Sequence, residues 1–179
     1  MLTSAIGFSG EHFHSLDEKK RLTVPARWRQ AVFGPSGRPG KGTKGEAAAP
    51  GLEANGGAAV AEEECFLAMP NPNGSITVHP PSAVVRLKEK LANVSMGDSR
   101  SLRVMQAIFG KSEFLRFDTQ GRFTLPEVLL KHAGLEKESV LVGMVANFHI
   151  WNPERHRAYV GEADLSPEEL GAVLRELNL

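Results

Sequence analysis

The stretch SLDEKKRLTVPARWR, residues 15–29, sets the pattern of this chain, because residues 116–130 repeat it as RFDTQGRFTLPEVLL. Both stretches read D-x-x-x-R-x-T-x-P when they are aligned at an offset of 118 − 17 = 101 positions. The identical positions are Asp17 with Asp118, Arg21 with Arg122, Thr23 with Thr124 and Pro25 with Pro126. Four neighbouring positions keep apolar character, namely Leu16 with Phe117, Leu22 with Phe123, Val24 with Leu125 and Trp28 with Leu129, so we expect two copies of one structural unit.

A second pair of segments extends the repeat. SITVHPP at residues 75–81 resembles NFHIWNP at residues 147–153, but the offset is now 148 − 76 = 72. The first copy therefore holds 101 − 72 = 29 more residues between its two conserved pieces. The surplus falls at residues 34–61, where Gly, Ala and Pro fill 18 of 28 positions. Such a composition buries too little apolar surface to offset its ordering entropy, so we expect a flexible insertion.

Each copy is expected to form a hairpin, a helix and a second hairpin. Apolar and polar residues alternate through HFHSLDEKKRLTV, and Asp17 is suited to hydrogen-bond the turn backbone. Gly121 ends the second turn and tolerates a positive φ. The first copy has Lys20 there, which would destabilise the turn by roughly 1 kcal/mol if the same conformation is kept. Pro25 and Pro126 are expected at the first position of a helix, where a missing N–H is tolerated.

The remaining segments carry simpler signals. Residues 65–79 and 139–151 predict the later hairpins, and residues 80–96 and 99–114 look helical. The tail SPEELGAVLRELNL opens with a capping box, Ser166 to Glu169, and its apolar stripe needs a partner. Trp28 on the first helix is expected in the core.

Charge is balanced overall, with 21 basic and 21 acidic residues, but it is uneven locally. Residues 17–29 contain five cations and two anions, a net charge of 5 − 2 = +3. Such a patch gives salt-sensitive attraction to phosphate, and arginine can also hydrogen-bond guanine edges. The alternative is structural, with the two aspartates tying the turns and Arg21 and Arg122 pairing with carboxylates. The patch favours the first reading, and its predicted DNA-binding residues are Lys19, Lys20, Arg21, Arg27, Arg29 and, in the sparser second copy, Arg122.

The sequence resembles the MraZ family of bacterial transcriptional regulators in its two motifs, their prolines and the block GLEKESVLVGMVANFHIW. That family is related to AbrB-type swapped-hairpin DNA-binding proteins. The resemblance covers roughly residues 8–159 apart from the insertion. It implies an α+β, β-rich fold, a double-split β-barrel built from two pseudo-equivalent halves with flanking helices. It assigns DNA contact to Asp17–Arg21 and Asp118–Arg122, with Gly121 and the two prolines as structural members of the motif.

The resemblance also implies partners and a place of action. The expected partner is double-stranded DNA carrying short direct repeats upstream of the protein's own gene, at the head of the division and cell-wall gene cluster. The expected assembly is a ring-like homo-oligomer, cytoplasmic and nucleoid-associated, with no cofactor, small-molecule substrate or membrane. The corresponding division of the chain is 8–81 for the first repeat, 82–112 for connecting helices, 113–159 for the second repeat and 160–179 for a C-terminal helix.

Other functions find less support in the sequence. The chain lacks the G-x-S-x-G, P-loop, G-x-G-x-x-G and H-E-x-x-H patterns, and His12 with His14 has no third ligand nearby, so neither an enzyme nor a metal site is expected. One cysteine and no signal-like start fit a reducing compartment. The stronger rival is an AbrB-like antitoxin or protein-interaction module, but such proteins usually carry one motif copy rather than two.

The insertion is predicted to be dispensable for folding, because the second copy closes the same order of elements without it. Replacing residues 36–60 by a short Gly/Ser linker is expected to leave the melting temperature nearly unchanged, since loop-closure entropy depends weakly on length. Calorimetry of the shortened and full chains checks this, and an unfolded or aggregated product would show that the segment is structured.

Overall fold

The computed structural model describes residues 7–34, 65–92, 99–161 and 166–176. The predicted insertion, apart from Gly34, lies outside the described residues. The elements are, in chain order, β1 (Glu11–Ser15), β2 (Arg21–Thr23), α1 (Ala26–Phe33), β3 (Phe66–Pro70), β4 (Ile76–His79), α2 (Pro81–Ala92), α3 (Ser99–Phe109), β5 (Glu113–Leu115), β6 (Arg122–Thr124), α4 (Glu127–Ala133), β7 (Glu138–Gly143), β8 (Phe148–Trp151), α5 (Pro153–Gly161) and α6 (Pro167–Glu176).

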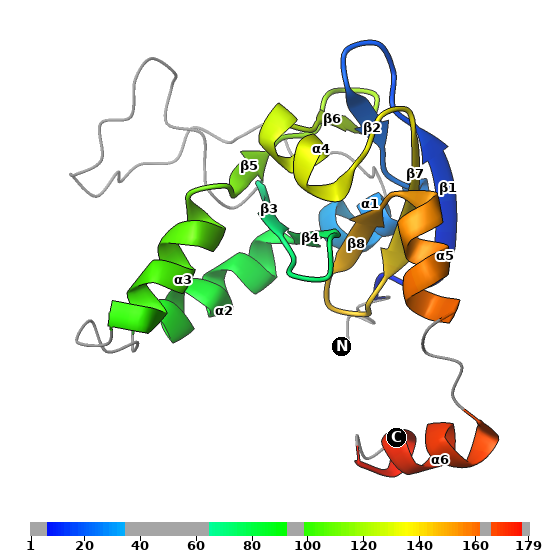
Figure 1. Cartoon of the computed structure of the whole chain (residues 1–179). Helices are drawn as coiled ribbons and strands as arrows, with labels where there is room; N and C mark the ends of the chain where they lie inside the picture. The colour runs from blue at the N-terminus through cyan, green and yellow to red at the C-terminus, as the bar shows by residue number, and fades with distance from the viewer. Residues whose placement is uncertain (1–6, 35–64, 93–98, 162–165, 177–179) are drawn as a thin grey trace.

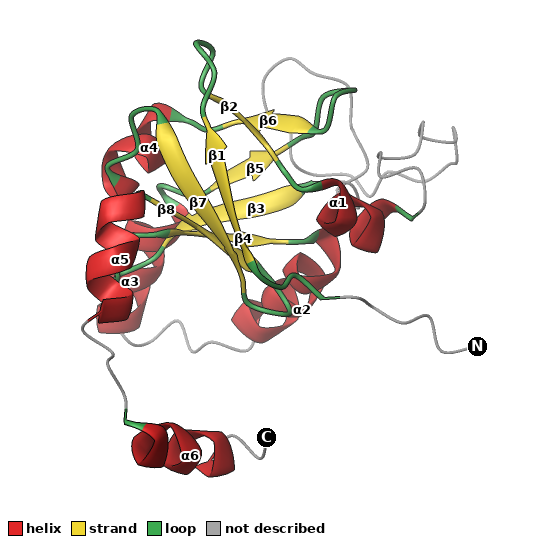
Figure 2. Cartoon of the chain, turned by 90° about the vertical axis from the view of Figure 1, so that its right-hand side faces the viewer, coloured by secondary structure: helices red, strands yellow, loops and turns green. Residues whose placement is uncertain are grey.

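The chain adopts a mixed α+β fold with a six-stranded antiparallel sheet, in the order β1-β7-β8-β4-β3-β5, and a separate β2-β6 ribbon. Figure 1 shows the ribbon at the top of the molecule, and in Figure 2 α4 and α5 lie on one side of the strands while α1 lies on the other. Among the described strands, β1 and β5 form the two edges of the sheet and no pairing joins them into a closed barrel.

The strand order shows how the two copies are related. By the offsets of the sequence repeat, β1 is equivalent to β5, β2 to β6, β3 to β7 and β4 to β8. Exchanging each strand for its equivalent gives the same sheet order, read from the opposite edge. In the ribbon, Leu22 lies opposite its own equivalent, Phe123. In the large sheet, Thr77 lies opposite its equivalent, His149. The repeat therefore folds about an internal pseudo-two-fold axis.

The local hairpins predicted around the D-x-x-x-R motifs are only partly present. The turns form, because the N–H of Asp17 donates to the carbonyl of Arg21 at 3.1 Å and the N–H of Asp118 to that of Arg122 at 2.7 Å. Beyond the turns the strands separate: β1 pairs with β7 and β5 with β3, each in the other copy. Strand period alone does not specify the partner, so this exchange was not visible in the sequence.

The core joins both copies. Leu22 and Phe123 are 0% and 1% exposed, and they belong to one apolar cluster with Trp28 of α1 and Leu129 of α4. Trp28 makes an edge contact with Phe8, with ring centroids 5.5 Å apart, an arrangement worth about 0.5–1.5 kcal/mol beyond area burial. The prediction that Trp28 belongs to the core is confirmed.

The helix ends follow the sequence signals with one shift. Pro25 and Pro126 occupy the position before the first helical residue, one residue earlier than predicted, and their carbonyls accept the first helical N–H bonds. Gly134 ends α4 with a φ of 64°, and its N–H donates to the carbonyls of Leu130 and Lys131. The predicted capping box is also present, since Glu169 accepts bonds from the N–H and hydroxyl of Ser166.

Candidate nucleic-acid interface

The β2-β6 ribbon brings the two D-x-x-x-R motifs together although 101 residues separate them in the sequence. Arg21 lies opposite Thr124, and Thr23 lies opposite Arg122. Because side chains alternate along a strand, these arginines and threonines share one face while Leu22 and Phe123 fill the core on the other. The ribbon therefore presents a pseudo-symmetric polar face.

Each aspartate organises its own turn. Asp17 Oδ1 accepts hydrogen bonds from the N–H groups of Lys19 and Arg21, both at 2.9 Å, and Oδ2 accepts from Arg21 Nε at 2.7 Å. The backbone hydrogen bond from Arg21 leads the contributions that lower the pKa of the Asp17 carboxyl, and the Arg21 guanidinium adds to it. One carboxylate thus fixes both the turn and the orientation of the arginine.

Asp118 repeats this geometry. Its Oδ1 accepts from the N–H groups of Gln120 and Arg122 at 2.8 Å and 3.0 Å, and its Oδ2 accepts from Arg122 Nε at 2.8 Å. Desolvation opposes ionisation of this carboxyl, but the backbone and guanidinium donors of Arg122 outweigh it and hold the pKa of Asp118 below its ordinary value.

The two turns also contact each other through charge. A guanidinium nitrogen of Arg21 lies 3.9 Å from Asp118 Oδ2, and one of Arg122 lies 4.0 Å from Asp17 Oδ2. All four side chains keep about a third of their surface exposed, from 29% to 34%. Arg21 and Arg122 are therefore not free cations projecting from the turns, as the functional reading of the sequence assumed, but members of a four-charge network with one face open to solvent.

Lys20 and Gly121 hold equivalent backbone conformations. Their φ angles are 57° and 76°, so Lys20 keeps the left-handed conformation of Gly121 although it is not a glycine. Each residue turns its carbonyl toward the other copy: that of Lys20 accepts from the N–H of Leu125 at 3.0 Å, and that of Gly121 accepts from Val24 at 3.3 Å. The strained residue is held because its carbonyl joins the two halves.

The other predicted cations lie in different places. Lys19 is exposed on the first turn, and Lys20 donates through Nζ to the carbonyl of Glu136 at 3.2 Å. Arg29 donates from Nε to the carbonyl of Val24. Its guanidinium crosses the second turn so closely that a Cβ on Gly121 would lie 2.3 Å from it.

Arg27 is directed elsewhere, since its guanidinium bonds the carbonyl and hydroxyl of Ser9 at 3.0 Å and 3.3 Å. The structure thus gathers Lys19, Lys20, Arg21, Arg29 and Arg122 around the two turns, and places Arg27 at the start of β1. Thr23 and Thr124 were not predicted as site residues, although their spacing of two from the arginines indicates that they share the polar face.

The two histidines of β1 lie in different surroundings. Burial, with a smaller effect of nearby His12, lowers the pKa of His14 and favours its neutral form. His12 instead packs edge-on against Trp28, with ring centroids 5.0 Å apart. Within the described residues, no three His, Cys, Asp or Glu side chains are grouped as a metal ion requires.

Comparison with known proteins finds relatives that match most of the chain. A Chlorobium limicola protein named Transcriptional regulator MraZ is 32% identical over 149 residues, which cover 83% of this chain and 86% of its own. This chain belongs to the MraZ family. Proteins of the same name from Heliobacterium modesticaldum and Thermomicrobium roseum are 30% and 28% identical and are covered over 99% and 96% of their lengths. The family's sequence model, described as "MraZ protein, putative antitoxin-like", matches residues 108–173.

The two turns predict opposite responses to substitution. Lys20→Gly is expected to raise the free energy of unfolding by roughly 0.5–1 kcal/mol, because it relieves the positive φ of Lys20 at the loss of one exposed hydrogen bond. Gly121→Ala is the matched control and is expected to destabilise, since its Cβ would meet Arg29. Urea unfolding of both variants checks this. Destabilisation by Lys20→Gly would mean that its hydrogen bond outweighs the backbone strain.

Proposed function

We propose that this MraZ-family chain is a sequence-specific DNA-binding transcriptional regulator, and that the β2-β6 ribbon with its two turns is the DNA-contacting surface. The observation that carries the proposal is the single pseudo-symmetric face that holds Arg21 and Arg122 between two carboxylates. The relatives are named as transcriptional regulators, and a two-stranded ribbon is one of the elements that fit the major groove of B-DNA.

The charge network explains how such a ribbon would engage DNA. Asp17 accepts from Nε of Arg21, a second guanidinium nitrogen of Arg21 lies 3.9 Å from Asp118, and 29% of the Arg21 side chain remains exposed to solvent. An arginine held in this way loses less side-chain entropy on binding, and its fork matches the O6 and N7 acceptors of guanine. The exposed Lys19 is suited to phosphate, which contributes affinity without sequence information.

The finer expectations belong to the same proposal. We propose that the sheet and ribbon together act as the double-split barrel of AbrB-like proteins, divided into repeats at 8–81 and 113–159, with connecting helices at 82–112 and a terminal helix at 160–179. The target would be short direct repeats upstream of the protein's own gene, in the division and cell-wall cluster. The working form would be a cytoplasmic, nucleoid-associated, ring-like homo-oligomer. Among the described residues, no helix has the length and hydropathy needed to cross a membrane.

A second candidate, an antitoxin that binds a toxin, is favoured by the antitoxin-like description of the family. The two fused motif copies in one chain argue for the regulator. Purification from the native cell distinguishes them, because an antitoxin would carry a second protein in fixed stoichiometry while the regulator would yield one polypeptide that retards its upstream DNA.

Substitutions on the ribbon are predicted to weaken DNA binding. Arg21→Ala is expected to cost about 1–3 kcal/mol of binding free energy, and Arg122→Ala less, because its turn has fewer cations of its own. Lys19→Ala is expected to lower the slope of log affinity against log salt by about one without changing the melting temperature. Electrophoretic retardation measures affinity, with Lys111→Ala, an exposed substitution away from the turns, as control.

Because Arg21 is also paired with Asp17, the melting temperature of Arg21→Ala is measured alongside its DNA affinity. Arg21→Lys keeps the charge but loses the fork, and it is expected to bind DNA more weakly than the parent. Unchanged affinity of folded Arg21→Ala would assign the arginine a structural role alone.

Repeated targets are predicted to increase affinity steeply. One pair of turns offers few cations, so binding to a single box is weak and sensitive to salt. If adjacent subunits engage successive boxes, the second engagement is intramolecular and raises affinity by about 10²–10⁴. Affinities for one, two and three boxes at constant DNA length check this. Equal values would contradict the multivalent mechanism, as would insensitivity to a half-turn change in spacing.

A further inference from the structure

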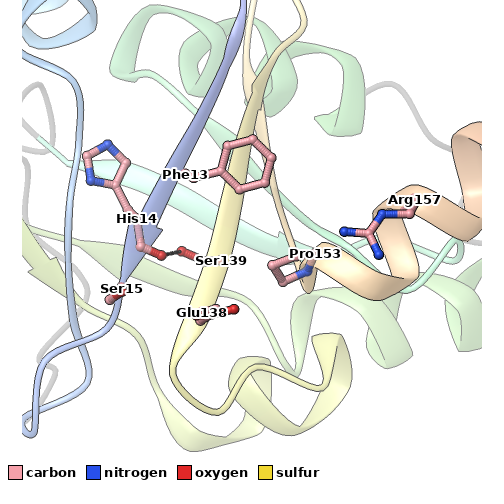
Figure 3. Close-up of a pocket in the computed structure, with 7 residues that line it drawn as sticks. All are labelled: Phe13, His14, Ser15, Glu138, Ser139, Pro153 and Arg157. Atoms are coloured by element: carbon pink, nitrogen blue, oxygen red, sulfur yellow. Dashed lines mark hydrogen bonds between the residues drawn. The ribbon is translucent and has the colours of Figure 1, made fainter.

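A groove runs between the edge strand β1 and helix α5. It lies on the side of α5 that faces away from the centre of the sheet. Two adjoining hollows of about 410 and 360 Å³ share Phe13, Pro153 and Arg157 as lining residues. Phe13 is 70% exposed, and Val160, at the far end of α5, is 51% exposed. Figure 3 shows Arg157 extending from α5 toward the strand that bears Phe13. A large aromatic side chain left this open on an edge strand marks a surface that needs a cover.

The amphipathic helix α6 is uncovered as well. Its apolar residues Leu170, Val173 and Leu174 are 48%, 40% and 39% exposed, and α6 contains no buried residue. In both views α6 stands apart from the rest of the chain (Figures 1 and 2). A helix of ten residues is marginal in water without a packing partner, so this face requires one.

The pseudo-two-fold axis indicates that a helix fits the groove. The repeat offsets relate β1, β7 and α5 around the groove to β5, β3 and α2 in the other half, and Phe13 to Phe114. In that half, α3 follows α2 and packs against β3. Phe114 is 48% exposed there, against 70% for Phe13. In chain order α6 follows α5 as α3 follows α2, so α6 is the helix with the matching position.

Charge complements the fit. Arg157 lines both hollows, and no carboxylate among the described residues pairs with it. The first turn of α6 holds Glu168 and Glu169. Glu169 is engaged by Ser166, which leaves the exposed Glu168 to meet a cation.

We propose that α6 of one copy of this chain packs into the β1-α5 groove of a second copy, with its apolar residues over Phe13 and Val160 and with Glu168 near Arg157. The second copy is the occupant because α6 lies away from the groove of its own chain, so exchange covers both surfaces at once. Such a head-to-tail contact closes into a ring when its rotation allows. The inference rests on, and deepens, the self-association in the proposed function.

Cross-linking between differently tagged chains tests the contact. One full-length chain carries Val160→Cys and the other carries Val173→Cys. The two proteins are mixed and treated with a short bis-maleimide. The expected product is a covalent pair carrying both tags. Val85→Cys, on α2 and 55% exposed, replaces Val160→Cys as the matched control, and the parent chain accounts for the buried Cys65. If no covalent pair forms, the proposal is overturned. It is also overturned if a cross-link forms only within single chains of a Val160→Cys/Val173→Cys double variant at high dilution, because that result would place α6 in the groove of its own chain.

Self-association measured by sedimentation gives a second readout. Leu170→Glu with Leu174→Glu is expected to weaken it by about 100-fold, whereas Ala172→Glu, on the other side of α6, leaves it near the parent value. Arg157→Glu is expected to weaken it about fivefold, and adding Glu168→Arg to restore it. Unaltered association in the leucine variant would overturn the proposal. Neither assay contains DNA, so a failure of the α6 contact would leave the DNA-binding proposal standing. Conversely, loss of DNA retardation with intact cross-linking would overturn only the DNA-binding proposal.

Discussion

The antiparallel pairing of β2 with β6 is the interaction on which the rest of this structure depends. Leu22 and Phe123 meet on the pseudo-two-fold axis and are fully buried, so the two ribbon strands bring their repeats to one point of the core. With that point fixed, each edge strand extends to the opposite half, and β1 completes β7 while β5 completes β3. Neither half has a complete sheet by itself, which makes the two repeats one cooperative unit.

The same pairing creates the candidate interface. Two aspartates and two arginines approach within 4.0 Å across the axis because the ribbon register places Arg21 beside Thr124 and Arg122 beside Thr23. Each carboxylate first satisfies the backbone N–H groups of its own turn and then orients a guanidinium. Partly exposed ion pairs contribute little to stability. Under the proposed function, the same carboxylates would hold the arginine forks ready for DNA.

Symmetry also shows where the two halves differ. The first turn carries Lys20 in a left-handed conformation where the second has Gly121, and the added charge comes with backbone strain. Strain of this kind persists where the surroundings over-determine the conformation, here through the carbonyl bond to Leu125. The other difference lies in the helices that follow α2 and α5: α3 packs against β3, whereas α6 stands apart from the rest of the chain (Figures 1 and 2).

The sequence by itself determined the repeat, the turn role of Asp17 and Asp118 and the burial of Trp28. These follow from residue type and short-range spacing, which act through local sterics and local hydrogen bonds. Only the tertiary structure decided that β1 leaves β2 for β7, that Arg21 and Arg122 share one charge network, and that Arg27 turns to Ser9 while Arg29 crosses Gly121. A period of two fixes which face of a strand is buried but not which strand lies beside it. Asp118, which contacts Arg21, and Gly121, which Arg29 crosses, lie 118 − 21 = 97 and 121 − 29 = 92 positions away from these cations, so only the packing of the whole chain brings them together.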